Sequence, residues 1–452
     1  MTQGSDLRRG VAVPGARLVR LARLGGLASG IAGGAMLEGA RRLARGQRAG
    51  LPDLLLTPAN AARLTAELAR MRGAAMKLGQ LMSMDAGDFL PPEMAAIMAR
   101  LRADAHPMPP RQLRAVLTAN WGADWQRRFA GFDTTPLAAA SIGQVHRART
   151  RDGRELAIKV QYPGVRRSID SDVANVAALI RLSGLLPAGL DLAPFLDEAR
   201  RQLHEEADYL AEAGHLARFG QLLAGVDGLQ VPALQADLTT AEVLAMDFVA
   251  GVPVESLETA PQALRDRLAS RLVALTMREM FELGWMQTDP NFANYRYDPV
   301  TDRLILLDFG ATRAVAPEVS AAYRDLLRAG LAGDTGGLMA AAEAVGLIGP
   351  GIAPARQELL QAMAETAFAP LRRAAPFDVA GEDIVRRLGE MAMAGGLGLS
   401  AEGGLEGLDH VPPMDTLFVQ RKLGGVYLLA HRLRARIDFG PLLAPWLEAR
   451  AA

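Results

Sequence analysis

The 452-residue chain lacks cysteine, carries no net charge at pH 7 and contains no long apolar run. Without thiols it can form neither a disulfide nor a thiolate metal site, which fits a reducing compartment. Its 50 basic and 50 acidic side chains balance, so no overall field favours nucleic acid as a partner. The six histidines are too scattered along the chain to predict a zinc centre.

A membrane-spanning helix needs about 20 consecutive apolar residues, and no such run occurs. The nearest approach is the uncharged segment 24–37, which is flanked by arginines. Its glycines at positions 26, 30 and 34 would form a small-residue stripe on a helix, and a flexible glycine-rich arm is an equal alternative. A short apolar segment with basic flanks could also lie on an anionic membrane surface. We expect a cytoplasmic protein without a transmembrane helix, whose membrane contact, at the inner face, would be peripheral.

Hydrophobic periodicity divides the chain into three parts. Residues 60–84 show helical spacing, and another helix ends near Asn120, so 1–120 is predicted to be a helical N-terminal extension. Strand-like alternation then begins after Trp125 and includes a hairpin through Asp152-Gly153. Helices are expected at 165–184 and 190–222, and a strand at 242–249.

From about residue 256 nearly everything except 287–310 has helical character. The predicted fold is therefore α+β and bilobal, like that of a protein kinase. The expected domains are the extension, a small strand-rich lobe at 121–250 with inserted helices at about 165–223, and a large helical lobe at 251–452. Within the large lobe, 418–437 is predicted to be one helix with an apolar and a strongly basic face. A core helix with a solvated side explains this pattern best, and a membrane-surface or partner-binding helix is the alternative.

Residues 287–310 carry three side chains suited to metal and phosphate chemistry: Asp289, Asn294 and Asp308. In protein kinases a catalytic-loop Asp is followed five residues later by a metal-binding Asn and, after a hairpin, by the Asp of Asp-Phe-Gly. Here a turn at Asp298-Pro299 and the apolar run 304–307 predict that hairpin. Each motif alone is common in solvated turns, but the combination in this order is rare.

A kinase also needs a lysine that pairs with phosphate and with a helix glutamate, one hairpin after a glycine-rich loop. Lys159, in LAIKVQYPGV, follows the loop 138–146 at a workable distance. An outward-facing lysine on a half-exposed strand is the alternative. Three alanines stand where glycine is expected, and alanine lacks glycine's access to positive φ, so this loop should be stiffer.

Seven segments together resemble one family, the UbiB atypical kinase-like proteins, which include the ADCK-type proteins. They are KLGQ at 77–80, AAASIGQVH at 138–146, AIKVQYPGV at 157–165, EADYLAEA at 206–213, VLAMDFVAG at 243–251, QTDPNFAN at 287–294 and LLDFGATR at 306–313. The segments occur in the family's order across about residues 60–320.

The resemblance implies a role for each matched position. Lys77 and Gln80 match the KxGQ motif, on a helix that in relatives lies across the place where a protein substrate would dock. Glu206 and Asp208 match the ExD motif, and Lys77 is expected to pair with this acidic pair. For the partner of Lys159 we favour Glu212, with Glu206 second, and the sequence does not separate them.

The same resemblance implies that the protein binds ATP and Mg²⁺. Ala138, Ala139, Ala140 and Ser141 would cover the phosphates. The adenine would lie at the linker formed by Met246, Asp247, Phe248 and Val249. The predicted catalytic residues are Asp289, Lys159 and Lys77, and the predicted metal ligands are Asn294 and Asp308, because magnesium prefers oxygen ligands.

Two departures from the family pattern matter. Relatives usually read HxDPHPGN where this chain has Gln287, Asn291, Phe292 and Ala293. The loop that aims Asp289 is thus rebuilt, which affects phosphoryl transfer more than nucleotide binding. After Gly310 only a few residues precede the next helix, which leaves no room for a peptide-docking segment, so protein-kinase activity is not expected.

Two functions are expected. The first, which the resemblance implies, is an ATPase or a small-molecule or lipid kinase that supports the biosynthesis of ubiquinone or another isoprenoid quinone. Its partners would be ATP, a lipid or quinone precursor, an anionic membrane contacted peripherally, and quinone-biosynthesis enzymes. The alternative is a nucleotide-sensing pseudokinase scaffold that organises lipid-modifying enzymes at a membrane surface.

Overall fold

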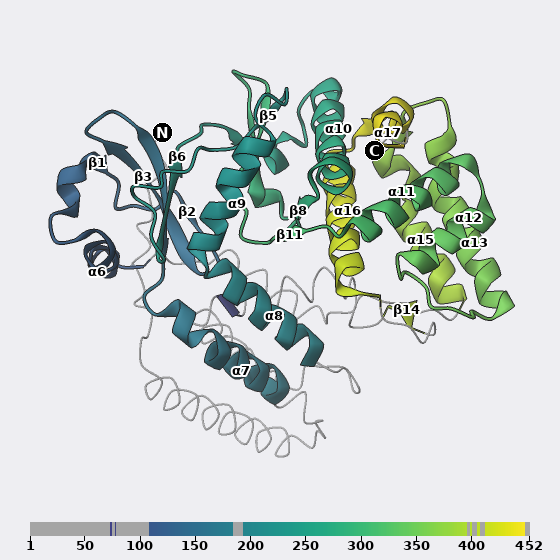
Figure 1. The fold of residues 1–452 in the computed structure, drawn as a ribbon, viewed down its shortest axis with the longest axis horizontal. Helices are drawn as coiled ribbons and strands as arrows, with labels where there is room; N and C mark the ends of the chain where they lie inside the picture. The colour runs from purple at the N-terminus through teal and green to yellow at the C-terminus, as the bar shows by residue number, and fades with distance from the viewer. Residues whose placement is uncertain are drawn as a thin grey trace, which may run out of the picture. The chain divides into compact units, whose positions relative to one another are not determined.

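The computed structural model describes residues 108–183, 193–395, 398–399, 405–406 and 412–447, together with Gly73, Ala74 and Lys77. The described residues form two compact units (Figure 1). Unit 1 contains those up to Ala213 and Leu234–Phe248, and unit 2 contains Gly214–Ala233 and those from Val249 onward. The predictions for segment 24–37 and for Gln80 lie outside the described residues. Of the predicted helix 60–84, Gly73, Ala74 and Lys77 are described, and all three are helical.

Unit 1 is built on an antiparallel sheet in which, among the described residues, five strands pair in the order β1-β3-β4-β6, with β2 on β3. The strands are β1 (Phe129–Phe132), β2 (Ala138–Ala139), β3 (Gly143–Thr150), β4 (Glu155–Gln161) and β6 (Val243–Asp247). The predicted hairpin joins β3 to β4, and Gly153 at its turn has φ +94°, which favours glycine. Thr150 and Asp152 close the turn by a side-chain hydrogen bond.

The helices of unit 1 follow the predicted order. They are α6 (Pro110–Trp121), the 3₁₀ turn η3 (Trp125–Arg128), α7 (Val165–Ser183), α8 (Ala193–Glu206) and α9 (Tyr209–Leu222), whose residues from Gly214 belong to unit 2. Aromatic side chains of α6, η3 and β1 pack together in the core, with the Trp121 and Phe129 ring centroids 5.3 Å apart. This packing fixes α6 against the sheet.

Unit 2 combines small sheets with a helical body. In its described part, β5, β10, β9 and β7 form one sheet, β8 pairs with β11, β12 with β15 and β13 with β14. The strands are β5 (Leu229–Gln230), β7 (Val252–Pro253), β8 (Trp285–Gln287), β9 (Tyr295–Asp298), β10 (Arg303–Leu306), β11 (Thr312–Ala314), β12 (Phe377–Asp378), β13 (Gly398–Leu399), β14 (Leu405–Glu406) and β15 (Arg436–Ile437). The turn predicted at Asp298-Pro299 joins β9 to β10.

The helical body of unit 2 includes α16 (Met414–Arg432), which Figure 1 shows in yellow. The other helices are α10 (Gln262–Arg278), α11 (Pro317–Ala332), α12 (Thr335–Ala344), α13 (Pro354–Phe368), α14 (Val379–Glu382), α15 (Ile384–Ala394) and α17 (Phe439–Leu447). Short helical turns are η4 (Val254–Leu257), the π-helical η5 (Glu279–Leu283), η6 (Phe292–Asn294) and η7 (Ala369–Arg372). Among the described residues, no helix is both long and apolar enough to cross a bilayer.

The helix predicted at 418–437 differs from the observed one at its C-terminal end. Helix α16 ends at Arg432, Arg434 adopts φ +48°, and β15 follows. About half of the apolar side chains of α16, among them Phe418, Val419 and Leu429, are fully buried within unit 2, and Met414 and Leu428 are exposed. The core-helix interpretation therefore fits, although not all of its basic residues face solvent, as described below.

Candidate active site

Lys159 lies near the middle of β4, opposite Val145 of β3 and Leu244 of β6. Its ammonium donates to both carboxylate oxygens of Glu212 on α9, at 2.8 and 2.9 Å. Lys159 is 8% exposed and Glu212 only 1%. A lysine is tolerated at so buried a position because a carboxylate neutralises it. Of the two partners left open by the sequence, the structure pairs Lys159 with Glu212.

Glu206 instead contacts the N-terminal helix. The Lys77 Nζ lies 2.7 Å from its Oε1, and the Ser141 hydroxyl donates to its Oε2. The expectation that Lys77 meets both acids of the ExD motif holds for Glu206. Asp208 has a different task, because its Oδ1 accepts the backbone N–H of Ala211 at 3.1 Å in the first turn of α9.

The alanine-rich loop forms a tight strand-and-turn element. Ala138 and Ala139 make up β2, and the Ala140 N–H donates to the Gly143 carbonyl at 2.8 Å. Gly143 cannot be replaced without movement, because a Cβ there would meet the Val160 carbonyl and lie 2.8 Å from the Tyr209 hydroxyl. Backbone pairing thus fixes this loop despite its lack of consecutive glycines.

Buried polar side chains support the loop from beneath. The Gln144 side chain accepts the Met108 backbone N–H at 2.8 Å, and its Nε2 lies 2.7 Å from His146 Nε2. His146 Nδ1 lies 2.8 Å from the Asp133 carbonyl oxygen, so Nδ1 carries the proton and Nε2 accepts. Burial lowers the pKa of His146, and the contact with Asp133 opposes this only in part. The imidazole is therefore neutral at neutral pH.

The predicted adenine linker begins in the sheet. Met246 and Asp247 are the last residues of β6, and the Phe248 N–H donates to the Glu155 carbonyl at 2.8 Å. The division between the two units falls between Phe248 and Val249. It lies beside the boundary predicted at 250/251.

In unit 2 the strand pairs β8–β11 and β9–β10 hold the segments that carry Asp289, Asn294 and Asp308. The Thr288 N–H donates to the Ala311 carbonyl at 2.8 Å, just before Asp289. The Leu307 N–H donates to the Asn294 carbonyl at 3.0 Å, just before Asp308. The short segment 308–310 is thus held at both ends by residues that flank Asp289 and Asn294.

The Asp289–Asn294 contact closes the catalytic-type loop. The Asn294 amide donates to the Asp289 backbone carbonyl at 3.1 Å and to its carboxylate at 3.2 Å. Its side-chain oxygen is left as the acceptor, which suits a magnesium ligand. Asp308, whose Oδ1 accepts the Gly310 N–H at 3.0 Å, would supply a carboxylate oxygen. Within the described residues no three His, Asp or Glu side chains form a metal cluster, so phosphate and water oxygens would complete the coordination.

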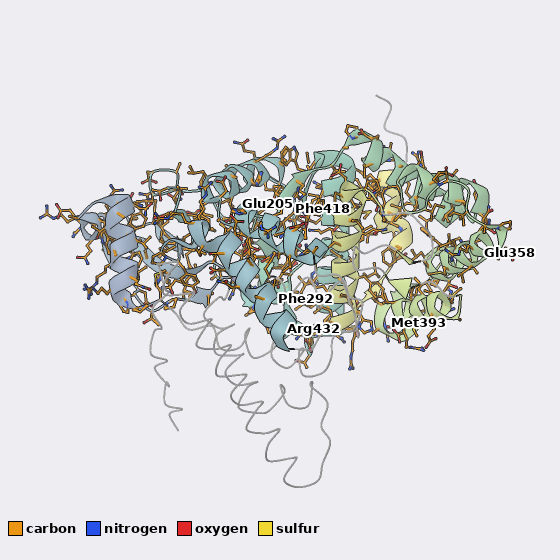
Figure 2. All side chains as sticks on the ribbon, turned by 90° about the horizontal axis from the view of Figure 1, so that it is seen from below. Glu205, Phe292, Glu358, Met393, Phe418 and Arg432 are labelled. Atoms are coloured by element: carbon orange, nitrogen blue, oxygen red, sulfur yellow. The ribbon has the colours of Figure 1, made fainter. Side chains whose placement is uncertain are left out.

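The loop that carries Asp289 is anchored by residues that the sequence analysis does not single out. Arg421 Nη2 lies 3.6 Å from the Asp289 carboxylate. Beside it on α16, Lys422 is 1% exposed, pairs with the equally buried Glu279 and contacts Gln287. At the other end of the loop, the Arg432 guanidinium lies over the Phe292 ring, 5.3 Å from its centroid (Figure 2).

These contacts correct the prediction of a uniformly solvated basic face on this helix, since Arg421 and Lys422 face the loop. The signal that could have found them is the pair of adjacent cations within an otherwise core-like helix.

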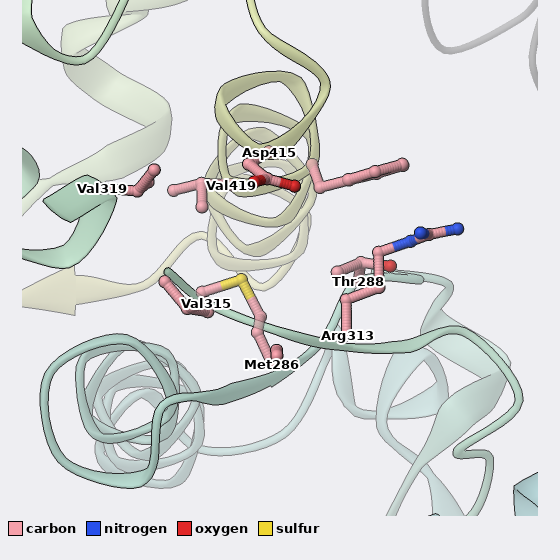
Figure 3. Close-up of a pocket in the computed structure, with 9 residues that line it drawn as sticks. Met286, Thr288, Arg313, Val315, Val319, Asp415 and Val419 are labelled. Atoms are coloured by element: carbon pink, nitrogen blue, oxygen red, sulfur yellow. The ribbon is translucent and has the colours of Figure 1, made fainter. Parts of the chain in front are cut away.

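A small pocket lies behind the same loop. Figure 3 shows its lining, with Met286 and Thr288 from β8 and its end, Arg313 and Val315 from β11 and its end, and Val419 from α16. Its volume is about 10 Å³, which holds at most one water molecule. It is therefore a packing gap and not a ligand site.

Lys159 belongs to unit 1, while Asp289, Asn294 and Asp308 belong to unit 2. That these residues line one common cleft stays a prediction.

A buried strand lysine paired with a helix glutamate, together with an Asp-x₄-Asn loop and a following Asp-Phe-Gly, defines a protein-kinase-like class of protein. The chain belongs to the ABC1 atypical kinase-like domain family, whose sequence pattern matches residues 100–342. This confirms the predicted atypical kinase-like family and its kinase-like fold.

The chain is similar over nearly its whole length to curated proteins of this family. It is 36% identical to "Atypical kinase COQ8B, mitochondrial" of Rattus norvegicus, covering 96% of this chain and 81% of that protein. It is 33% identical to "Atypical kinase COQ8, mitochondrial" of Saccharomyces cerevisiae, covering 97% and 86%. "Atypical kinase coq-8, mitochondrial" of Caenorhabditis elegans is 36% identical, and the chain spans 57% of its length.

A solved structure supports the fold. The complex of Rv3197 from Mycobacterium tuberculosis with erythromycin superposes with a TM-score of 0.59 at 24% identity, over 86% of this chain and 95% of that one.

Proposed function

We propose that this protein binds ATP with Mg²⁺ and acts as an ATPase or as a kinase of a small molecule or lipid in isoprenoid quinone biosynthesis. The observation that carries the proposal is the Lys159–Glu212 ion pair, in which both carboxylate oxygens are engaged. In protein kinases this pair aligns the lysine with the nucleotide phosphates and marks a competent arrangement.

Asp289 would orient or deprotonate the acceptor hydroxyl or water. Its carboxylate is fixed by Asn294 on one side and by Arg421 on the other, which restricts its rotamers. A magnesium ion held by Asn294 and Asp308 would neutralise charge that builds on the transferring phosphoryl group. The strand pairs β9–β10 and β8–β11 fix the backbone near Asn294 and Asp308. Substrate binding therefore needs to order little of this backbone.

Access to the nucleotide would be limited by the N-terminal helix. Lys77 and Ser141 share the Glu206 carboxylate, which ties this helix to the alanine-rich loop that would cover the phosphates. A Cβ at Gly73 would lie 3.1 Å from Ile142 Cγ2, so the helix is packed closely on the loop. Such a closed arrangement favours a small acceptor over a peptide.

The acceptor is proposed to be a lipid or quinone precursor, with the protein in peripheral contact with an anionic membrane and with quinone-biosynthesis enzymes. The relatives' names assign those proteins to mitochondria and to the atypical kinases. The short connection between Gly310 and α11 also leaves little backbone with which to bind a peptide.

The test is magnesium-dependent ADP production by the purified protein, with and without anionic vesicles and phenolic quinone precursors. We expect turnover that Asp308→Asn abolishes, because the variant loses a metal-binding charge. Turnover no greater than that of Asp308→Asn under every condition would refute the enzymatic proposal.

A nucleotide-sensing scaffold is the second candidate, favoured by the replacement of the usual HxDPHPGN residues around Asp289. Complementation distinguishes the two. If Asp289→Asn fully sustains quinone synthesis in cells that lack the protein, chemistry at Asp289 is not the function.

A further inference from the structure

Lys422 is a fully buried cation that the proposed nucleotide chemistry does not use. It lies in the middle of α16 with 1% exposure. Its ammonium contacts three oxygens: Glu279 Oε2 at 3.1 Å, Gln287 Oε1 at 3.1 Å and the Tyr295 hydroxyl at 3.0 Å. An ammonium has three N–H donors and no acceptor. Lys422 donates hydrogen bonds to Gln287 and Tyr295, and its contact with Glu279 is an ion pair.

The charge on this lysine is maintained by its surroundings. Burial alone would lower the pKa of Lys422, but Glu279 and Tyr295 outweigh burial and hold the pKa above its ordinary value. Burial raises the pKa of Glu279, and the Lys422 ammonium offsets part of that rise. Removing either partner alone would leave the other as an uncompensated buried group.

Because Lys422 cannot accept a hydrogen bond, it determines which way the Gln287 amide points. The Gln287 oxygen must face the ammonium, and it also accepts the Tyr295 hydroxyl at 3.0 Å. The amide nitrogen then faces the opposite way and donates to the Asp289 backbone carbonyl at 2.9 Å. Lys422 is thus connected to the backbone of Asp289 through one intervening side chain.

The same cation fixes both ends of the loop. Gln287 is the last residue of β8, and Tyr295 is the first residue of β9, so they flank Asp289 and Asn294. Glu279, which starts the π-helical turn η5, accepts the Gln287 backbone N–H at 3.3 Å. Single π-helical turns inside helices often occur at functional sites. Four polar side chains from α16, η5, β8 and β9 therefore form one buried network behind the loop.

We propose that Lys422 is a positioning residue, which holds the catalytic-type loop through Gln287 and Tyr295 so that Asp289 is aimed at the acceptor. The proposal rests on the proposed function. It assigns to this network the task of fixing the loop between β8 and β9, which carries Asp289 and Asn294. A buried ion pair adds little net stability compared with apolar packing. The Lys422–Glu279 pair therefore differs from an apolar core contact in that it orients the loop.

The experiment compares full-length Glu279→Gln/Lys422→Met with wild type. The double variant removes both charges, so no uncompensated charge stays buried. Thr416→Val is the matched destabilising control, because it loses a buried hydrogen bond from α16 to Val345 away from the loop. Two readouts are hydrogen–deuterium exchange of peptides covering 285–298 and the kcat and KM for MgATP, both measured well below the melting temperature of each variant.

In the double variant we expect at least about tenfold faster exchange at 285–298 and at least about tenfold lower kcat, with an almost unchanged KM for MgATP. Thr416→Val should change neither the loop exchange nor kcat. Gln287→Met, which leaves the Glu279–Lys422 pair in place, should reproduce the loss of the double variant even if that variant fails to fold. Wild-type loop exchange and kcat in folded Gln287→Met or in the double variant would overturn the proposal.

The two proposals fail differently. Wild-type protein without any magnesium-dependent turnover would refute the enzymatic function, whereas the exchange of 285–298 still decides whether Lys422 holds the loop.

Discussion

The Lys77 ammonium lies 2.7 Å from Glu206, whose second carboxylate oxygen accepts a hydrogen bond from Ser141. The Lys77 side chain is 2% exposed and that of Glu206 is 19% exposed, so solvent screens this ion pair only in part. The helix that carries Lys77, which precedes the sheet in the sequence, is therefore held against the alanine-rich loop by an ion pair as well as by packing.

Breaking this contact should accelerate nucleotide release. In Lys77→Met the Glu206 carboxylate loses its counter-charge, so the helix and the loop should separate more readily. We expect a several-fold faster dissociation of a fluorescent ATP analogue in stopped-flow measurements. Glu206→Gln should act in the same direction, and Arg111→Ala, an exposed change on α6, should not. Equal dissociation rates in Lys77→Met and wild type would show that the contact does not limit access.

Lys159→Met should be strongly destabilising, because it removes the ammonium that neutralises the buried Glu212 carboxylate. Loss of one member of a buried pair costs about 3–5 kcal/mol of unfolding free energy. The double variant Lys159→Met/Glu212→Gln should recover most of this loss while nucleotide binding stays weak. Urea unfolding followed by tryptophan fluorescence measures the first effect, and titration calorimetry with MgATP measures the second. Recovery of ATP affinity together with stability would contradict a role of Lys159 in binding phosphate.

The buried imidazole of His146 should make unit 1 less stable at acidic pH. Its pKa is lowered by burial, so between the folded pKa and the ordinary value of about 6.5 the unfolded chain binds more protons than the folded one. The stabilisation by the neutral imidazole is present above about pH 6.5 and is lost as the pH falls through the folded pKa. Protonation would also place a second N–H against the Gln144 amide, whose oxygen is engaged by Met108.

The measurement is the unfolding free energy between about pH 5 and 8, by urea titration of wild type and His146→Gln. The stability difference between the two proteins should shrink as the pH falls, because the variant has no imidazole to titrate. A difference that is constant over this pH range would exclude the assignment of acid sensitivity to His146.

Local patterns predicted much of this fold and of the candidate site. The Asp152-Gly153 turn and the alternating strands around it fixed the hairpin that carries Lys159. The turn at Asp298-Pro299 and the apolar run 304–307 predicted the β9–β10 hairpin between Asn294 and Asp308, because these two strands are neighbours in the chain. The pairing of β8 with β11, which are separated in the chain by β9 and β10, was not predicted. Glu212 was favoured over Glu206, but only tertiary packing could separate the two.

The anchoring of the loop that carries Asp289 could not be predicted from local patterns. Lys422 contacts Gln287 from 135 residues away, and in sequence a lysine on an amphipathic helix is usually solvated. The C-terminal end of α16 was also placed too late, because the helical periodicity continues through residues that instead form β15 with β12 as partner. Both errors arise where long-range contacts override a local preference.

Two adjacent glycines of α16 allow a test of the contact between this helix and the loop that carries Asp289. A Cβ built at Gly425 would overlap the ring of Pro290, the residue that follows Asp289, whereas one at Gly424 has no neighbour within 4 Å. Gly425→Ala must therefore displace either the helix or the loop, at a cost of about 1–3 kcal/mol. Gly424→Ala should be neutral or stabilising by about 0.5–1 kcal/mol, because alanine is the better helix former.

If the loop moves, Gly425→Ala should lower kcat for MgATP turnover more than its stability loss explains, since a displacement near 1 Å can cost about 100-fold. Thermal unfolding and steady-state kinetics of the two variants measure both effects with the same chemical change one position apart. Because Gly424→Ala adds the same methyl group to the same helix, any activity difference between the variants comes from the contact with Pro290. Matching kcat values in the two folded variants would mean that the helix yields and that α16 does not set the position of Asp289.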